Sequence, residues 1–199
     1  MEILCQRNDL VYTSCYCEEN VWKLLKGLLD KQDRDDLYAV FISNKNRSVP
    51  IWCQKASEKR SRPVVWDYHV IAIHKDMSLL KSNVYDFDTI LNFPEPFESY
   101  AKNSFPYMPH LPKEFDRLYR VIPAKYYISN FASDRSHMIN KQTGEYQAEP
   151  PIYECIKSLH SSNNIQEFIE MDLEDATNTL ETQHGVIMRQ NNFFNFFTE

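Results

Sequence analysis

The sequence is poor in glycine and has no long apolar run. Only 3 of its 199 residues are glycine and 10 are proline, which excludes a collagen-like or low-complexity chain. No apolar stretch approaches the roughly 18 residues that a membrane-spanning helix needs. The first ten residues lack the basic segment followed by an apolar segment that marks a signal peptide. We therefore expect a globular protein that contacts no membrane and stays in a reducing compartment.

The chain also has no excess of positive charge. Its 22 Lys and Arg against 28 Asp and Glu give a formal net charge of −6, which disfavours binding to nucleic acid through its phosphates. Five cysteines, an odd number, do not indicate a disulfide framework in a chain without a secretory signal. Zinc bound by Cys15, Cys17 and His69 is also disfavoured, because Cys-x-Cys is a poor spacing for structural zinc and no second cysteine pair follows.

Large apolar side chains are abundant. The chain is 43% hydrophobic and holds 12 Phe and 12 Tyr, enough area to bury a sizeable core. No repeat or change in composition marks a boundary, so we expect one domain over residues 1–199. From Glu18 to Leu29, apolar residues recur at spacings of three and four, which predicts an amphipathic helix.

Four segments have the composition of β-strands. Residues 37–43 and 49–53 are rich in β-branched and aromatic side chains and are separated by a polar turn, which predicts an antiparallel hairpin. Residues 64–74 alternate, with both faces largely apolar, and this predicts a single central strand covered on both sides. The composition of residues 83–90 predicts the next strand.

The rest of the chain is less regular. Prolines between residues 92 and 112 interrupt any pattern, and we expect a long loop there that packs across the sheet or walls a site. Shorter elements are predicted beyond it: a strand at 115–122, a helix at 126–131, a helix at 165–171, a strand at 186–188 and a terminal helical turn at 193–197.

A candidate nucleophile lies where the first helix begins. A thiolate attacks carbonyl carbon far better than a thiol, so a catalytic cysteine needs a helix N-terminus, a cation or a base. Cys17 lies at the predicted helix start and Cys15 two residues before it; a buried structural thiol explains either residue as well. Because Glu18 and Glu19 oppose a thiolate, Cys17 would depend on a histidine partner.

His69 is the best partner for that thiol. An imidazole in the middle of a strand needs a specific hydrogen bond, although a satisfied core histidine explains His69 equally simply. On the predicted strand at 83–90, Asp86 and Asp88 share a face. Either carboxylate would orient the imidazole and complete a Cys-His-Asp arrangement of nucleophile, base and orienting acid.

Long motifs carry a resemblance to a known family. Tyr12 to Trp22 reads Y-T-S-C-Y-C-E-E-N-V-W, and W-D-Y-H-V follows at 66–70, Y-D-F-D-T at 85–89, N-F-A-S-D-R-S-H-M at 130–138 and E-P-P-I-Y-E-C at 149–155. In this order, over nearly the whole chain, they resemble the protein N-terminal glutamine amidohydrolase family. The resemblance implies a papain-like, transglutaminase-type α+β fold, with an N-terminal helix that carries the nucleophile packed on a largely antiparallel sheet. It also implies a monomer of cytoplasm and nucleus that uses no metal or other cofactor.

The activity implied by the resemblance is hydrolysis of the side-chain amide of an N-terminal glutamine. Proteins and peptides with a free N-terminal Gln would be converted to the glutamate form with release of ammonia, which feeds arginylation in the N-degron pathway. By the same resemblance Cys17 is the nucleophile that forms a thioester, His69 the base and Asp86 the orienting acid. The alternatives are a transglutaminase or cysteine protease, and a binding module that recognises N-termini without turnover.

An enzyme for N-terminal glutamine must read the free α-amine of its substrate, because internal glutamine would otherwise react. A buried carboxylate or backbone carbonyls would do so, since a site built around polar groups rejects ligands that lack the match. The carboxylates to consider are Glu18, Asp67 and Asp134. Their structural explanations are, respectively, a first-turn helix charge, a strand ion pair and a loop salt bridge with Arg135.

Overall fold

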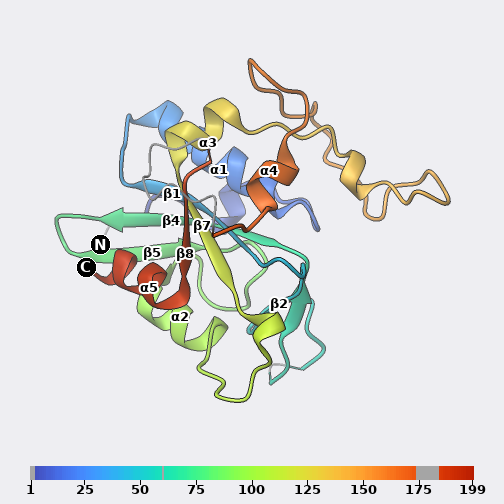
Figure 1. The fold of residues 1–199 in the computed structure, drawn as a ribbon. Helices are drawn as coiled ribbons and strands as arrows, with labels where there is room; N and C mark the ends of the chain where they lie inside the picture. Colours follow the sequence, from blue (N-terminus) through green and yellow to red (C-terminus); the bar gives the residue numbers. More distant parts are fainter. Residues whose placement is uncertain (1–2, 60, 174–183) are drawn as a thin grey trace.

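The computed structural model describes residues 3–59, 61–173 and 184–199, and within them a six-stranded sheet forms the centre (Figure 1). The strand order is β6-β5-β4-β1-β7-β8, and each neighbouring pair is antiparallel. Two further strands, β2 and β3, pair with each other in a separate small sheet. The fold is therefore α+β with antiparallel sheets. The strands are β1 Leu37–Ser43, β2 Val49–Ile51, β3 Val64–Trp66, β4 His69–Asp76, β5 Lys81–Tyr85, β6 Glu95–Pro96, β7 Leu118–Pro123 and β8 Val186–Arg189.

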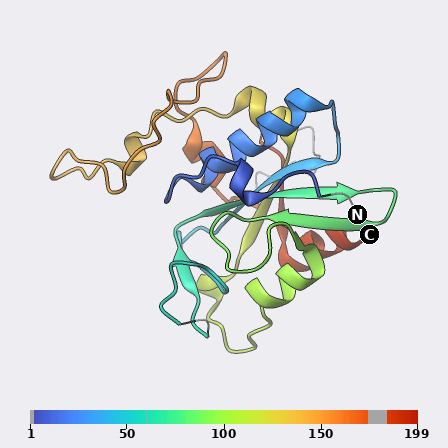
Figure 2. The same ribbon diagram turned by 180° about the vertical axis from the view of Figure 1, so that it is seen from behind.

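Helices cover both faces of the large sheet, as the opposite views of Figures 1 and 2 show. On one face lie α1 (Cys17–Lys31), α3 (Ala124–Asn130) and α4 (Ile165–Ile169); on the other lie α2 (Phe97–Ser104) and α5 (Gln190–Thr198). Short 3₁₀ turns are η1 (Arg7–Asp9), η2 (Lys113–Phe115) and η3 (Ser136–Met138). Between α3 and α4 the chain extends away from the sheet as an arm (Figure 1). No helix in the described ranges is long and apolar enough to cross a membrane.

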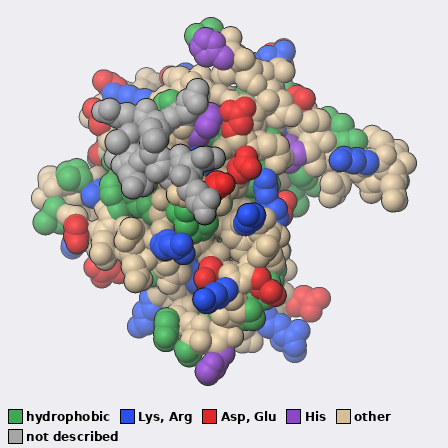
Figure 3. All heavy atoms as spheres, viewed as in Figure 1, with side chains coloured by type: hydrophobic (Ala, Val, Ile, Leu, Met, Phe, Trp, Pro, Cys, Tyr) green, Lys and Arg blue, Asp and Glu red, His purple; other side chains and the backbone are tan. Residues whose placement is uncertain are grey.

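Two hydrophobic cores result, one on each face of the sheet. Along β1, Ala39 and Phe41 pack under α1, α3 and α4, whereas Val40 and Ile42 pack against α2 and α5, as the period of two in a strand requires. Burial on both faces explains why β1 is apolar throughout. On the surface seen in Figure 3, acidic and basic side chains are interspersed.

The single strand predicted over residues 64–74 is wrong. The chain leaves the small sheet after β3 and enters the large one at His69, so that Asp67 and Tyr68 separate two strands. At the break, Asp67 Oδ1 accepts the Tyr68 N–H at 2.8 Å and the Asp67 carbonyl accepts the Ser43 hydroxyl at 2.7 Å. These side-chain bonds replace ladder bonds, and they make His69 the first residue of a strand and not its middle.

The predicted hairpin between residues 37–43 and 49–53 is also wrong. With two apolar faces, β1 is a central strand and pairs with β4 and β7, while β2 pairs with β3. Asn44 closes the turn after β1 by donating to the carbonyls of Ser48 and Glu114 at 2.8 and 2.9 Å. That turn leads the chain out of the large sheet.

Two further expectations fail near the site. The segment 92–112, predicted as loop, contains β6 and α2; Pro96 is the N-cap of α2, where its missing N–H removes no helical hydrogen bond. The strand predicted at 83–90 is β5, which ends at Tyr85, so Asp86 and Asp88 lie in the loop that follows it and not on a strand face.

The other predicted elements are confirmed, with ends shifted by a few residues. The helix predicted from Glu18 is α1. The predicted elements at 115–122, 126–131, 165–171, 186–188 and 193–197 are β7, α3, α4, β8 and α5.

Candidate active site

Cys17 is the first residue of α1, with Tyr16 as the N-cap. The Asn20 side chain fixes the entry of the chain into the helix, because its Oδ1 accepts the Thr13 N–H at 2.9 Å and its Nδ2 donates to the Thr13 carbonyl at 2.8 Å. The Cys17 side chain is 8% exposed, whereas Cys15 lies exposed before the helix at a φ of 67°. The local structure thus places the thiol of Cys17, at a helix N-terminus, on the interior side.

The environment of Cys17 favours the neutral thiol. Burial, and then the charges of Glu18 and Asp88, raise the pKa of the Cys17 thiol well above its ordinary value. A hydrogen bond from the backbone N–H of Val70 acts in the opposite direction. A thiol held in this way reacts as a nucleophile only if a base removes its proton.

The imidazole of His69 and the carboxylate of Asp86 form a fully buried pair, with His69 Nε2 at 2.9 Å from Asp86 Oδ1. Asp86 Oδ1 also accepts the Asp88 N–H at 2.9 Å, and Oδ2 accepts from Gln54 Nε2 at 3.0 Å and the Tyr100 hydroxyl at 2.8 Å. Burial opposes ionisation of Asp86, but His69 and the other donors outweigh it and lower its pKa to about 2. Asp86 is therefore a fixed negative charge.

The negative charge of Asp86 affects the pKa of His69. Burial lowers the pKa of its imidazole, but the charge of Asp86 and the hydrogen bond to it prevail, and the net pKa is raised. The ring stacks on Trp66 with centroids 5.3 Å apart. Its other nitrogen, Nδ1, has no hydrogen-bond partner among the described residues. Val70, which directly follows His69, lowers the pKa of the Cys17 thiol through its backbone N–H, and Asp88, whose ligand atom lies within 4.8 Å of those of His69 and Asp86, lines the same cavity as Cys17.

Cys17 lines a cavity of about 580 Å³, within the roughly 300–1,000 Å³ usual for ligand sites. Residues from α1, the β3–β4 junction, the loop after β5, the arm and α4 surround it. Its lining residues are Cys15, Cys17, Arg47, Trp66, Asp67, Tyr68, Asp88, His137, Met138, Gln147, Gln166 and Ile169.

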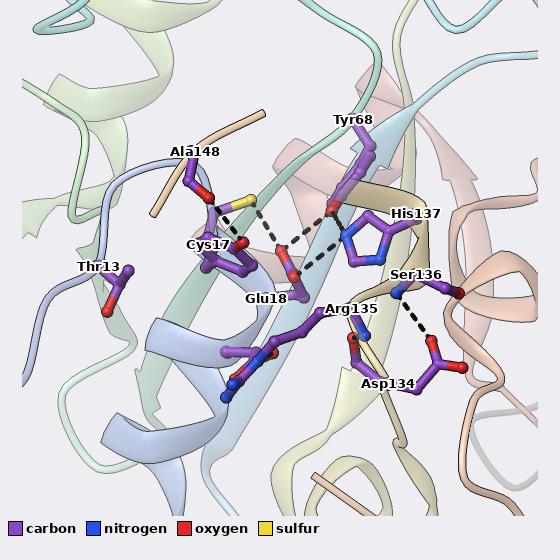
Figure 4. A network of polar contacts seen from close by, with 12 residues as sticks. Thr13, Cys17, Glu18, Tyr68, Asp134, Arg135, Ser136, His137 and Ala148 are labelled. Atoms are coloured by element: carbon purple, nitrogen blue, oxygen red, sulfur yellow. Dashed lines mark hydrogen bonds and ion pairs between the residues drawn. The ribbon is translucent and has the colours of Figure 1, made fainter. Parts of the chain in front are cut away.

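The three carboxylates predicted to bind substrate differ in position. Glu18 is fully buried beside the Cys17 sulfur, its Oε2 at 3.6 Å (Figure 4). Asp67 lines the cavity but is exposed and holds the Tyr68 N–H. Asp134 lies outside the cavity lining; it accepts the Ser136 N–H at 2.9 Å and points away from Glu18 in Figure 4.

The predicted salt bridge between Asp134 and Arg135 is replaced by another pair. Arg135 Nε and Nη2 each donate to Glu19 at 2.9 Å, and Nη1 donates to the Pro151 carbonyl at 3.0 Å. This bidentate pair is almost fully buried. It ties the loop that carries η3 to helix α1.

Among the residues of the cavity wall that sequence reasoning missed are Tyr68 and His137. The Tyr68 hydroxyl donates to Glu18 Oε2 at 3.1 Å and lies 3.3 Å from His137 Nε2. In the sequence, both residues lie inside motifs that carry the family resemblance, Tyr68 in W-D-Y-H-V and His137 in N-F-A-S-D-R-S-H-M. Neither motif indicates that its residue faces the other.

The cluster offers one potential set of metal ligands. Atoms of His69, Asp86 and Asp88 lie within 4.8 Å of one another. However, the His69 and Asp86 atoms are already hydrogen-bonded to each other, and Asp86 Oδ2 accepts two further donors. This donor-rich surrounding suits a carboxylate that orients an imidazole better than one that binds a cation.

A helix-start thiol, an imidazole and a buried carboxylate at one cavity are typical of cysteine-dependent hydrolases and acyl transferases. Comparison of the sequence with known proteins narrows this class. The family model described as N-terminal glutamine amidase matches residues 12–197. The chain therefore belongs to the N-terminal glutamine amidase family, which is a family of enzymes.

Individual relatives agree with the family model. The protein N-terminal glutamine amidohydrolase of Bos taurus is 45% identical over 170 residues, which cover 84% of this chain and 81% of that protein. The Homo sapiens protein of the same name is 44% identical over 168 residues, 83% and 80% of the two chains. The Drosophila melanogaster protein, again of that name, is 42% identical over 166 residues, 82% and 80%.

Proposed function

We propose that the protein hydrolyses the side-chain amide of N-terminal glutamine in proteins and peptides, giving N-terminal glutamate and ammonia. The observation that carries the proposal is the identity of 42–45% to relatives named for this activity. The geometry supports it, because a helix-start thiol lines a cavity of ligand size, and Asp88, which lines the same cavity, lies close to the buried His69–Asp86 pair.

In the proposed mechanism Cys17 attacks the side-chain carbonyl carbon of the glutamine. His69 Nδ1 accepts the thiol proton as the S–C bond forms, and then gives a proton to the nitrogen as the C–N bond breaks and ammonia leaves. The product is a γ-thioester. Water then gives a proton to His69 and attacks the thioester, the C–S bond breaks, and the Cys17 sulfur regains its proton.

Asp86 fixes the imidazole for these steps. By accepting from Nε2 it keeps the proton on that nitrogen and leaves the lone pair on Nδ1, the atom without a partner in the described structure. The charge of Asp86 also stabilises the imidazolium that forms. The backbone N–H of Cys17, at the first position of α1, is a donor for the oxyanion.

A papain-like, transglutaminase-type fold and the biological setting belong to the same proposal. The order nucleophile helix, histidine strand, then acid after the next strand supports this fold. We propose that the enzyme is a monomer with one catalytic domain over residues 1–199, that it needs no cofactor, and that it acts in cytoplasm and nucleus. There its product would enter arginylation in the N-degron pathway.

Ammonia release from a peptide that begins with Gln tests the proposal. The comparison peptides are the same sequence N-acetylated and one that begins with Asn. We expect release from the free Gln peptide, and a loss of at least about 1,000-fold in Cys17→Ala. Cys15→Ala and the matched control Cys155→Ala should stay within about tenfold of the parent.

The rival activities give different products. Peptide cleavage would indicate a protease, and incorporation of an added amine in place of hydrolysis would indicate a transglutaminase. If the folded protein binds the Gln peptide but releases no ammonia, the binding-module alternative holds and the proposed activity is wrong.

A further inference from the structure

We propose that Glu18, Tyr68 and His137 form an ammonium-binding site that takes the α-ammonium group of the substrate. The site rests on the proposed function and deepens it, because it would restrict the enzyme to glutamine at a free N-terminus. The three side chains come from the first turn of α1, the residue before β4, and η3 in the arm. Figure 4 shows them converging beside the Cys17 sulfur.

Glu18 has a buried carboxylate oxygen that is not satisfied. Glu18 Oε2 accepts from the Tyr68 hydroxyl at 3.1 Å and from the Cys17 thiol at 3.6 Å. Glu18 Oε1 is buried and accepts no hydrogen bond from any described residue; His137 Nε2 lies 3.6 Å from it. A buried carboxylate oxygen without a donor is unfavourable, so a ligand that supplies an N–H there would be bound strongly.

The electrostatic surroundings of Glu18 also favour a cationic ligand. Burial, and then the neighbouring Glu19, raise the pKa of Glu18 to about 8, which indicates that the carboxylate has no cation of its own. The guanidinium of Arg135 is held by Glu19. Of the groups that face Glu18 from the packed elements, Tyr68 and Tyr127 are neutral phenols, and burial lowers the pKa of His137. With that pKa Glu18 is mostly the neutral acid at pH 7 before substrate binds, and a bound ammonium would lower the pKa and stabilise the ionised carboxylate.

The number of hydrogen-bond acceptors at the site also fits an ammonium group. An ammonium group has three N–H bonds to donate when it is attached to carbon. Glu18 Oε1, the Tyr68 hydroxyl oxygen and, in the neutral tautomer that carries its proton on Nδ1, His137 Nε2 offer three acceptors. His137 Nε2 lies 3.6 Å from Glu18 Oε1 and 3.3 Å from the Tyr68 hydroxyl oxygen. A secondary amide, as in an acetylated or internal glutamine, offers a single N–H and no charge, and would leave Glu18 unpaired.

The reach of a glutamine fits this arrangement. Its α-nitrogen is separated from the side-chain carbonyl carbon by four bonds, or roughly 4–5 Å when extended. Glu18 Oε2 lies 3.6 Å from the Cys17 sulfur, so an ammonium held at the far side of the carboxylate leaves the carbonyl carbon near the sulfur. Asparagine is shorter by one methylene and would not reach the sulfur from the same anchor.

The test measures peptide binding and turnover separately. Binding is followed by calorimetry in Cys17→Ala protein, with a Gln-initiated peptide and its N-acetylated form. We expect the free peptide to bind at least about 100-fold more tightly than the acetylated one, and Glu18→Gln to remove most of this difference. The exposed Glu154→Gln serves as the matched control and should leave the preference unchanged.

A second variant guards against a folding defect at buried Glu18. His137→Lys places a tethered ammonium beside Glu18 at a side chain that is 12% exposed. We expect it to abolish binding of the free peptide. In protein that retains Cys17, the rate of thiol alkylation by iodoacetamide, a small amide without an amine, should stay within about threefold.

The outcomes separate the two proposals. If Cys17→Ala protein binds free and acetylated peptides equally, or if Glu18→Gln and His137→Lys both keep the preference, the ammonium site is wrong whether or not ammonia is released. If the free peptide is preferred and this preference is lost in the variants while wild-type protein releases no ammonia, the ammonium site stands and the proposed activity is wrong.

Discussion

Asp86 holds its negative charge inside the protein with four hydrogen bonds, from His69, Gln54, Tyr100 and the Asp88 N–H. Its pKa in the folded protein, about 2, is below the ordinary value of 3.8. A carboxyl group with a lowered folded-state pKa contributes stability that is complete above its unfolded pKa and is lost as the pH falls through the folded one. For Asp86 that window runs from about pH 4 to about pH 2.

We predict that the wild-type protein loses about 2 kcal/mol of unfolding free energy across this window through Asp86 alone. Asp86→Asn should be less stable at pH 6, and the difference between the two proteins should shrink by that amount as the pH falls. Urea unfolding at pH 6, 4 and 2 measures it. A constant difference at all three values would contradict the assignment of the charge to Asp86.

At the level of single residues, the sequence indicated which side chains could take part in the chemistry better than it indicated how they are arranged. The helical pattern and the isolated strand histidine were enough to select Cys17 and His69 as candidates. The choice between Asp86 and Asp88 stayed open on spacing, because a strand over 83–90 would put both on one face. In the structure Asp86 bonds to His69, whereas Asp88 accepts the Tyr12 hydroxyl at 2.6 Å. That contact spans 76 residues, and no local pattern predicts it.

The bidentate pair between Arg135 and Glu19 connects two elements, the arm and α1. Removing one partner of a buried ion pair leaves an uncompensated charge, which costs about 3–5 kcal/mol. We predict a loss of this size in Arg135→Ala, measured by urea unfolding at pH 7. A loss below about 1 kcal/mol would mean that the pair is not buried in solution.

A double replacement separates charge from packing at this position. Because an apolar pair of similar volume often replaces a buried ion pair without loss, Glu19→Leu combined with Arg135→Met should recover most of the stability lost in Arg135→Ala. Failure to recover it would show that the hydrogen bond from Arg135 to the Pro151 carbonyl matters more than the ion pair.

The segment before the first helix is bound to the loop that carries Asp86. Arg7 donates to the carbonyls of Asp86 and Thr89 at 3.2 and 3.3 Å and lies over the Phe93 ring. Tyr12 adds its bond to Asp88 in the same loop. The part of this segment before residue 12 lies outside the match to the family model.

We predict that Arg7→Ala lowers kcat/KM for a Gln peptide by about tenfold, because small displacements of catalytic groups are costly to rate. Ammonia release measures it, with the exposed Arg62→Ala as the matched control. Arg7→Lys keeps a donor and should restore part of the loss. Equal rates in Arg7→Ala and Arg62→Ala would show that the loop holds Asp86 in place without Arg7.

At the level of elements, periodic segments were predictable and pairings were not. The apolar spacing of α1 and the composition of β1 identify these elements correctly. The break at Asp67 and Tyr68 depends on Ser43, a distant residue that donates to the Asp67 carbonyl. The prolines around α2 predicted loop, although Pro96 precedes the helix at a position where proline is tolerated.

The whole molecule depends on its two cores, and Phe41 is central to the one that supports the site. Its ring lies 5.6–6.4 Å, between centroids, from the rings of Tyr68, Tyr127, Phe131 and Phe168. Replacing such a large buried residue with a small one removes buried apolar area from the core and leaves a cavity. We predict that Phe41→Ala costs about 3–5 kcal/mol of unfolding free energy.

The exposed Val65→Ala is the control for that measurement, since its side chain is 55% exposed, and it should change stability by less than about 0.5 kcal/mol. Because Tyr68 packs on Phe41, Phe41→Ala should also weaken discrimination between free and acetylated peptides. A loss of stability without that second effect would show that the position of Tyr68 does not depend on this core.

The burial of the Cys17 thiol affects how fast a folded protein substrate can react. Since the largely buried Cys17 lines a cavity sized for a small ligand, a substrate has to insert its first residue as a loose chain end. A glutamine that opens a β-strand, or that packs against its own protein, cannot do this until that end detaches. Under the proposed activity, the rate at which the N-terminal glutamine of a folded protein is deamidated would therefore depend on how often its N-terminus detaches from the rest of that protein.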